Sequence, residues 1–229
     1  MLFKEIGKKG QTILRKKTVL LVGVGALGTT AAELLCRAYI GKLILFDNDK
    51  VELNNLQRQS LFDETDLLKS KAKQAKIKLK RVNRNVDIEV YEKRITKDNV
   101  DLLKRLKPDI VLDCTDNLET RFLLNDFCIK NGIPWIFCTV AGSKGFVKVI
   151  YKNACLNCIF DRNKIGESCR EIGIINTAVH FASSIQVTEA IKFLLGKKTD
   201  NDLIYFDIWN LKIDKIKVKK LKNCRICGK

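Results

Sequence analysis

Residues 18–28 of the chain read Thr18-Val19-Leu20-Leu21-Val22-Gly23-Val24-Gly25-Ala26-Leu27-Gly28. An apolar run leads into a G-x-G-x-x-G loop, and the helix-forming residues 30–35 follow directly. This order predicts a buried strand, a tight turn and a helix. Glycines let the backbone approach a ligand closely, and the free N–H groups at the start of a helix attract anionic phosphate. The segment therefore predicts a nucleotide-binding loop.

An acidic residue follows at the distance that a nucleotide site requires. The apolar residues 43–46 end in Asp47, about twenty residues after the loop, where a carboxylate can accept the ribose hydroxyls. A nicotinamide-dependent dehydrogenase and an ATP-using enzyme fit this pattern equally well. An alternative stays open, in which the glycines serve only the close packing of the strand against the helix.

Length and charge limit the class of protein. A chain of 229 residues suits a single α/β domain spanning 1–229. The net charge of +17 favours acidic partners such as tRNA, nucleotides or an acidic carrier protein. Because the lysines are spread along the chain, a generally Lys-rich surface explains the charge as well, and nucleic-acid binding is not required.

The cysteines and the apolar segments indicate the compartment. Nine cysteines, with no apolar uncharged segment at the N-terminus, favour a reducing cytoplasm, where cysteine serves metal binding or catalysis more than disulfides. The most apolar predicted helix, at 172–195, carries polar residues such as His180 and Glu189 and is unsuited to a bilayer. We therefore expect a cytoplasmic protein with no membrane partner.

Strand and helix patterns alternate along the chain. Helices are predicted at about 29–39, 69–82, 99–106 and 118–130, and strands at 42–46, 87–95, 109–112 and 134–140. A strand at 146–151 is expected to be antiparallel, and residues 5–7 and 11–14 are expected to form a short helix before the first strand. The alternation predicts a Rossmann-like doubly wound α/β sheet, mostly parallel and extended by later antiparallel strands.

Polar segments follow two of the predicted strands. One runs from Asp47 to Gln59, and the other is Asp113-Cys114-Thr115-Asp116-Asn117. Ligands of an open parallel sheet bind at the carboxyl ends of its strands, so Asp116 and Asn117 should face the same crevice as Asp47. Lys71 lies in the first turn of a predicted helix, where a cation is mildly unfavourable unless a phosphate lies nearby.

Two C-x-x-C pairs lie about seventy residues apart, and each can offer two thiolates to one metal ion. They are Cys155 with Cys158 and Cys224 with Cys227. Two such knuckles predict a closed tetrahedral Zn²⁺ site that joins 155–158 to 224–227 near the C-terminus. The alternative is four unrelated cysteines.

Several of these segments together resemble one family. They are the loop at 23–28, Leu45-Phe46-Asp47-Asn48-Asp49-Lys50-Val51-Glu52, Asn54-Asn55-Leu56-Gln57-Arg58-Gln59, Lys69-Ser70-Lys71-Ala72, residues 113–117 and both cysteine pairs. The chain resembles the ubiquitin-activating-enzyme-like superfamily, in its ThiF/MoeB/HesA branch, over roughly residues 5–227. The box at 54–59 is the most specific of these elements.

The resemblance implies an ATP site and its residues. By that resemblance the nucleotide is bound by Gly23, Gly25, Gly28, Asp47, Asp49, Asn54, Asn55, Gln57, Arg58, Lys71, Asp116 and Asn117. Asn55, Arg58 and Lys71 meet the phosphates, and Asp116 organises Mg²⁺. Attack of a carboxylate on the α-phosphate brings two anions together, so cations must neutralise the charge that develops. A hydride-transfer site has no need of this cluster.

The implied activity is that of an adenylyltransferase. The C-terminal glycine carboxylate of a small ubiquitin-like or sulfur-carrier protein, ending in Gly-Gly, attacks ATP to give an acyl-adenylate and pyrophosphate. A thiol or a sulfur donor then displaces AMP. Cys169 corresponds to a loop cysteine that some family members use for a covalent bond with the carrier.

The resemblance also implies a homodimer in which an N-terminal arginine reaches the partner's ATP site. This sequence begins Met1-Leu2-Phe3-Lys4 and lacks that motif. Either the motif precedes this sequence, or Lys4, Arg15 or another cation substitutes for it, or the contact across the dimer interface is absent. Two other functions stay open. One is a tRNA-modifying adenylating cyclase of the threonylcarbamoyladenosine dehydratase type, and the other is a non-catalytic scaffold of the same fold.

Overall fold

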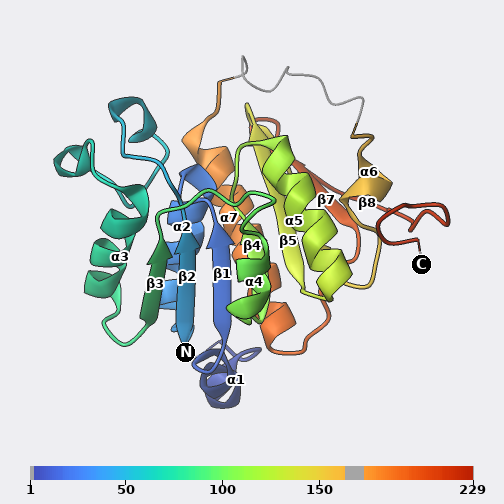
Figure 1. Cartoon of the computed structure of the whole chain (residues 1–229), viewed down its shortest axis with the longest axis horizontal. Coiled ribbons are helices and arrows are strands. Elements are labelled where there is room, and N and C mark those ends of the chain that lie inside the picture. The colour runs from blue at the N-terminus through green and yellow to red at the C-terminus, as the bar shows by residue number, and fades with distance from the viewer. Residues whose placement is uncertain (1–2, 163–172, 229) are drawn as a thin grey trace.

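A computed structural model describes residues 3–162 and 173–228, and an eight-stranded sheet crosses the whole molecule (Figure 1). The strands are β1 (Thr18–Val22), β2 (Lys42–Phe46), β3 (Asp87–Tyr91), β4 (Ile110–Asp113), β5 (Trp135–Ala141), β6 (Lys144–Ile150), β7 (Leu203–Asp207) and β8 (Lys212–Ile216). The α-helices are α1 (Gly7–Leu14), α2 (Ala26–Arg37), α3 (Lys71–Val82), α4 (Asp101–Arg105), α5 (Leu118–Asn131), α6 (Leu156–Ile159) and α7 (Asn176–Leu194). Two short 3-10 helices, η1 (Leu53–Asn55) and η2 (Glu64–Asp66), lie between β2 and α3.

The sheet has the order β3-β2-β1-β4-β5-β6-β7-β8, and the predicted doubly wound fold is confirmed. Strands β3, β2, β1, β4 and β5 pair in parallel, whereas β6, β7 and β8 are antiparallel additions. The chain leaves β1 toward β2 and later returns to the other side of β1 as β4. The carboxyl ends of β1 and β4 therefore flank a topological switch point, where such sheets bind their ligands.

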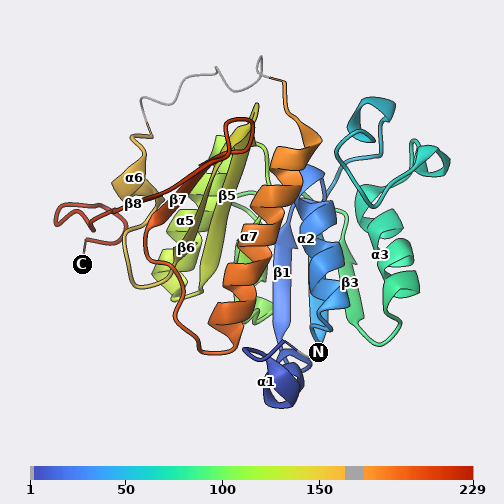
Figure 2. The ribbon, with the colours of Figure 1, turned by 180° about the vertical axis from the view of Figure 1, so that it is seen from behind.

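Helices cover both faces of the sheet. Figure 1 shows α4 and α5 in front of it, and Figure 2 shows α2 and α7 on the opposite face with α3 beside α2. The central strands are buried on both sides: Leu21 and Leu45 pack toward α2 and α7, and Leu20 and Ile44 pack into the other layer. This double burial explains why these strands read as continuous apolar runs.

The element boundaries differ from the sequence expectation at a few places. Strand β3 ends at Tyr91, short of residue 95, because its only neighbour β2 ends at the paired residue Phe46. Helix α1 begins at Gly7 and ends at Leu14, within the expected short helix of residues 5–14, and β6 is antiparallel as expected. In the part of the chain that the structure describes, no helix combines the length and apolar character needed to cross a membrane.

Candidate functional site

A cavity of about 940 Å³ lies at the carboxyl ends of the parallel strands. Loops that follow β1, β2 and β4 line it together with residues of α5 and the end of β5. Most of the predicted nucleotide residues are among its lining: Gly23, Gly25, Asp47, Asp49, Asn54, Asn55, Arg58, Lys71, Asp116 and Asn117. Arg58, Lys71 and Asp116, which the predicted chemistry requires in one place, thus share one cavity.

Two of the predicted residues lie outside the cavity lining. Gln57 is exposed, because the box folds into a helical turn that directs successive side chains to different sides. Gly28 lies within α2, where a Cβ would come 2.1 Å from the Gly23 carbonyl oxygen. Gly23 itself has φ +95°, and a Cβ there would lie 2.5 Å from the Cys114 carbonyl oxygen.

Gly25 differs from the other two glycines. A Cβ on Gly25 would find only the Gln59 Nε2 atom within 4 Å, at 3.8 Å. Strand-to-helix packing therefore explains Gly23 and Gly28, whereas Gly25 faces free space at the start of α2. The N–H groups of that helix end are available to an anion.

Asp47 connects the glycine loop to the end of β2. Its Oδ2 accepts a hydrogen bond from the Val24 N–H at 2.7 Å, and its Oδ1 accepts one from the Asp49 N–H at 2.8 Å. Burial raises the pKa of Asp47, although these two backbone donors act in the opposite direction. The carboxylate therefore fixes the loop in the shape that lines the cavity.

Lys71 and Asp49 form a pair at the start of α3. The Lys71 Nζ lies 3.1 Å from the Asp49 Oδ2, and the Lys71 N–H donates to the Asp49 carbonyl at 3.0 Å. Ser70 caps the helix through its side chain. Lys71 is only 6% exposed, so its ammonium group is held at the cavity wall.

The box at 54–59 is braced by its own side chains. The Arg58 Nη1 donates to the Asn54 carbonyl at 3.0 Å, and the Gln59 Nε2 donates to the Asn55 Oδ1 at 2.8 Å. The Asn55 Nδ2 donates to the Asn54 Oδ1. Asn55 and Gln59 are buried, so the turn presents Arg58 at the cavity from a rigid base.

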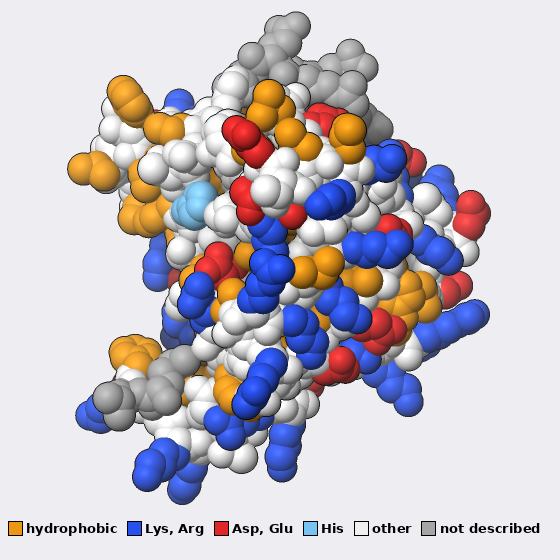
Figure 3. Space-filling model, turned by 90° about the vertical axis from the view of Figure 1, so that its left-hand side faces the viewer, with side chains coloured by type: hydrophobic (Ala, Val, Ile, Leu, Met, Phe, Trp, Pro, Cys, Tyr) orange, Lys and Arg blue, Asp and Glu red, His pale blue; other side chains and the backbone are white. Residues whose placement is uncertain are grey.

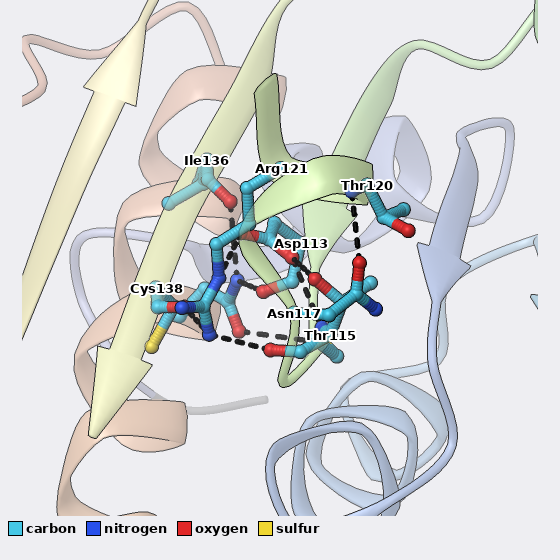
Figure 4. Close-up of polar contacts among 9 residues, drawn as sticks. Asp113, Thr115, Asn117, Thr120, Arg121, Ile136 and Cys138 are labelled. Atoms are coloured by element: carbon cyan, nitrogen blue, oxygen red, sulfur yellow. Dashed lines mark hydrogen bonds and ion pairs between the residues drawn. The ribbon is translucent and has the colours of Figure 1, made fainter. Parts of the chain in front are cut away.

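The loop that carries Asp116 is held by a buried ion pair (Figure 4). The Asp113 Oδ1 accepts hydrogen bonds from the Thr115 N–H at 3.0 Å and the Thr115 Oγ1 at 2.7 Å. The Arg121 Nε lies 3.3 Å from the Asp113 Oδ2, and the Arg121 Nη2 donates to the Thr115 carbonyl at 2.5 Å. Burial raises the pKa of Asp113, although the Arg121 charge opposes that shift.

The next two residues complete this loop. Asn117 caps α5, since its Oδ1 accepts from the Thr120 N–H at 2.9 Å. Asp116 is exposed and makes no hydrogen bond or ion pair with any residue of 3–162 and 173–228. Its carboxylate is therefore available to a ligand of the cavity.

Sequence reasoning missed two residues that shape this region. Arg121 lines the cavity, and Gln186 of α7 donates from Nε2 to the Asp113 carbonyl at 2.9 Å and the Ile136 carbonyl at 3.3 Å. A signal for Arg121 was present: it shares the helical spacing of the buried Leu124 and Cys128. A cation on an apolar helix face needs a buried partner.

The four cysteines of the C-x-x-C pairs meet on the other side of α5. Their Sγ atoms all lie within 4.8 Å of one another, with 3.6 Å between Cys155 and Cys224 and 3.4 Å between Cys158 and Cys227. Tetrahedral Zn–S bonds of about 2.3 Å place sulfur atoms about 3.8 Å apart, so this geometry fits Zn²⁺. Burial of the Cys224 thiol acts to raise its pKa, but hydrogen bonds, led by those from the backbone N–H groups of Cys227 and Ile226, together outweigh burial and lower that pKa to about 7.

The remaining cysteines differ in what the structure says of them. Cys169 lies outside the described residues. Cys36, Cys114, Cys128 and Cys138 are buried, and burial raises the pKa of each thiol. These four thiols therefore belong to the core and are poor nucleophiles.

Known proteins resemble this chain in sequence and in fold. The chain is 38% identical over 234 residues to the sulfur carrier protein ThiS adenylyltransferase of Bacillus subtilis (strain 168), covering 99% of this chain and 69% of the relative. It is 33% identical over 234 residues to the protein of the same name from Escherichia coli (strain K12), covering 100% and 92%. The crystal structure of E. coli MccB with ATP superimposes with a TM-score of 0.86 at 25% identity, over 95% of this chain and 68% of that one.

Fold and cavity together define an α/β protein of the doubly wound class with a cavity at its topological switch point. The chain belongs to the ThiF family, whose model matches residues 1–227. The resemblance drawn from the motifs is thereby confirmed.

Proposed function

We propose that this chain adenylates the C-terminal glycine carboxylate of a small ubiquitin-like sulfur carrier, with ATP as the AMP donor. The observation that supports this most is the meeting of Arg58, Lys71 and Asp116 in one cavity beside the open helix end at Gly25. The relatives named as adenylyltransferases of sulfur carrier proteins support the same reaction class.

The reaction joins two anions, and the cavity offers the means to do so. A carboxylate oxygen of the carrier bonds to the α-phosphorus, the bond from that phosphorus to the bridging oxygen breaks, and pyrophosphate leaves with the electron pair. Arg58 and Lys71 stabilise the charge that develops on the phosphoryl oxygens. The N–H groups at the start of α2 act in the same way.

Asp116 is the residue that would hold Mg²⁺. An exposed carboxylate without a partner among the described residues suits a hard cation that is shared with phosphate oxygens. When bound, Mg²⁺ supplies positive charge to the triphosphate. Zn²⁺ has a different place, since Cys155, Cys158, Cys224 and Cys227 form a closed set of thiolates that suits a structural ion.

Further partners stay predictions. These partners are a sulfur donor that displaces AMP and a second copy of the chain in a homodimer. The cytoplasm as the compartment of the protein is a prediction as well. A ubiquitin-fold carrier ending in Gly-Gly is the partner on which the proposal depends.

The decisive experiment is intact mass spectrometry. The protein is incubated with ATP, Mg²⁺ and the sulfur carrier ThiS of B. subtilis, and the carrier should gain the mass of AMP. Asp116→Asn should reduce the rate at least about a hundredfold, since it removes a metal-bearing charge from the reacting centre. Asp98→Asn, which neutralises an exposed carboxylate outside the cavity, should act like wild type. Adenylation at the wild-type rate by Asp116→Asn would refute the role of Asp116.

The charge of the molecule supports one competing function. Lys and Arg side chains cover much of the face on the α3 side (Figure 3), where Lys73, Lys76 and Arg81 are exposed. A tRNA-modifying adenylating cyclase would use such a face. It predicts tRNA binding that weakens steeply between low and moderate salt, and ATP turnover that needs no carrier.

A further inference from the structure

The cavity lining also includes Arg121, which comes from a different part of the sheet than Arg58 and Lys71. Arg121 extends from the first turn of α5 toward β5, where its Nη2 lies 3.5 Å from the Cys138 carbonyl oxygen. Arg58 and Lys71 come from the segment and the helix that follow β2. Strands β2 and β5 are separated by β1 and β4 in the sheet, which places them about 14 Å apart. The cations therefore stand on opposite sides of the switch point.

Two of the three guanidinium nitrogens of Arg121 already contact other protein atoms. Nη2 donates to the carbonyls of Thr115 and Cys138, and Nε faces the Asp113 carboxylate at 3.3 Å. Nη1 makes no hydrogen bond to any described residue, and the side chain lines the cavity. Arg121 is 7% exposed, so its orientation is fixed before a ligand arrives.

The cavity wall beside Arg121 is uncharged on the β5 side. On the β5 side it is formed by Thr139, Val140, Ala141, Ile174 and Val179, none of which carries a charge. The triphosphate is attracted to the other side, where the glycine loop, Arg58 and Lys71 lie. A tail of glycines, which has no side chains, fits the uncharged side.

We propose that Arg121 binds the terminal carboxylate of the carrier through Nη1 and aims it at the α-phosphate. This inference rests on the proposed function and adds a named site for its second substrate. A guanidinium fixed by three partners orients a carboxylate at little entropic cost. Its charge also offsets the repulsion between the carboxylate and the phosphate, and no atom of Arg121 is consumed.

The test compares two chemical forms of the carrier's C-terminus, each with the wild-type enzyme and with Arg121→Met. The probe is ThiS of B. subtilis, ending in Gly-Gly with either a free carboxylate or a carboxamide. Binding is measured by calorimetry in the presence of a non-hydrolysable ATP analogue. Wild type should bind the carboxylate form at least about tenfold more tightly, as expected for one charge-assisted hydrogen bond. Arg121→Met should bind the two forms within about twofold of each other.

Controls separate this role from a structural one. Because Arg121→Met leaves the Asp113 carboxylate buried without its partner, the pair Asp113→Asn/Arg121→Met is measured as well. Arg121→Lys retains the charge and should restore part of the preference for the carboxylate. Because Asp113 and Arg121 also hold the loop that carries Asp116, the affinity for the ATP analogue is measured in each variant, and the ratio between the two carrier forms is compared at saturating analogue in the variants that melt cooperatively.

The outcomes are distinct. A purely structural Arg121 would weaken both carrier forms equally and leave their ratio at the wild-type value, which would overturn the inference. The inference is also wrong if wild type binds both forms equally well while it adenylates the carboxylate form. If wild type neither binds nor adenylates the carrier, the proposed function itself fails.

Discussion

Single residues in the glycine loop have separable roles that mutation can distinguish. Gly28→Ala places a Cβ 2.1 Å from the Gly23 carbonyl oxygen, and we expect it to destabilise the fold by more than about 3 kcal/mol. Gly25→Ala meets only one side-chain atom, at 3.8 Å, so its melting temperature should stay within about 2 °C of wild type. Its affinity for ATP should nevertheless fall at least about tenfold, since the methyl group occupies space meant for phosphate. Calorimetry and thermal melting measure the two effects, and normal ATP binding by Gly25→Ala would contradict the assignment.

Residues that follow a strand directly could be predicted, and residues placed by tertiary contacts could not. Asp47 and Asp116 stand where apolar runs end, and the sheet brings such positions to one edge. The family resemblance places Gln57 in the nucleotide site by its position in the box, but the local helical turn directs its side chain to solvent. Arg121 belongs to the site because its partners Thr115 and Cys138 come from other elements. No local sequence pattern predicts contacts between such distant residues.

At the scale of elements, η2 fastens the segment with the 54–59 box to α3. Lys78 of α3 forms ion pairs with Asp63 and Asp66, the latter at 2.7 Å. The bond from Lys78, with further bonds from Thr65, lowers the pKa of Asp63 from 3.8 to about 2. Because this pKa is lower in the folded state, the pair stabilises the contact fully above about pH 4 and loses its effect as the pH falls toward 2.

A carboxyl titration followed by NMR checks this contact. In Lys78→Met the pKa of Asp63 should rise toward the ordinary 3.8, and the acid loosening of residues 63–66 should begin at a higher pH. Lys76→Met, which removes an exposed cation of the same helix that pairs with neither Asp63 nor Asp66, should leave this pKa near 2. An unchanged Asp63 titration in Lys78→Met would show that another group sets its pKa.

The parallel half of the sheet was easier to predict than its edge. Strands β1, β2, β4 and β5 are buried on both faces and read as apolar runs bounded by turn signals. Most residues of strand β8 are exposed, among them Lys212, Ile213 and Lys215. Because neither face of this strand is buried, its sequence lacks the alternation of apolar and polar residues that indicates a strand. It forms because β7 offers a free edge. Such pairing depends on distant residues and is invisible to a local pattern.

At the scale of the whole molecule, the cysteine cluster joins the C-terminal tail to α5. The Leu156 N–H beside the cluster donates to the Asn125 Oδ1 at 2.9 Å, and the Asn125 Nδ2 donates to the Asn157 Oδ1 at 3.0 Å. Asn125 is fully buried in α5, the helix whose first turn holds Arg121. An ion bound by the four thiolates would therefore stabilise both the tail and the helix that shapes the cavity.

Removal of two ligands should expose this link. If the four thiolates hold a zinc ion as we propose, Cys224→Ser/Cys227→Ser should lose it, and the stability of this variant should fall by at least about 2 kcal/mol, because metal binding contributes directly to folding. Hydrogen exchange should accelerate in the tail and in α5 near Asn125 and remain slow in α2. Cys36→Ala, which removes a buried thiol of α2 outside the cluster, should keep its zinc. Metal analysis that finds equal zinc in wild type and the double variant would refute the site, and unchanged exchange in α5 would refute its connection to the cavity.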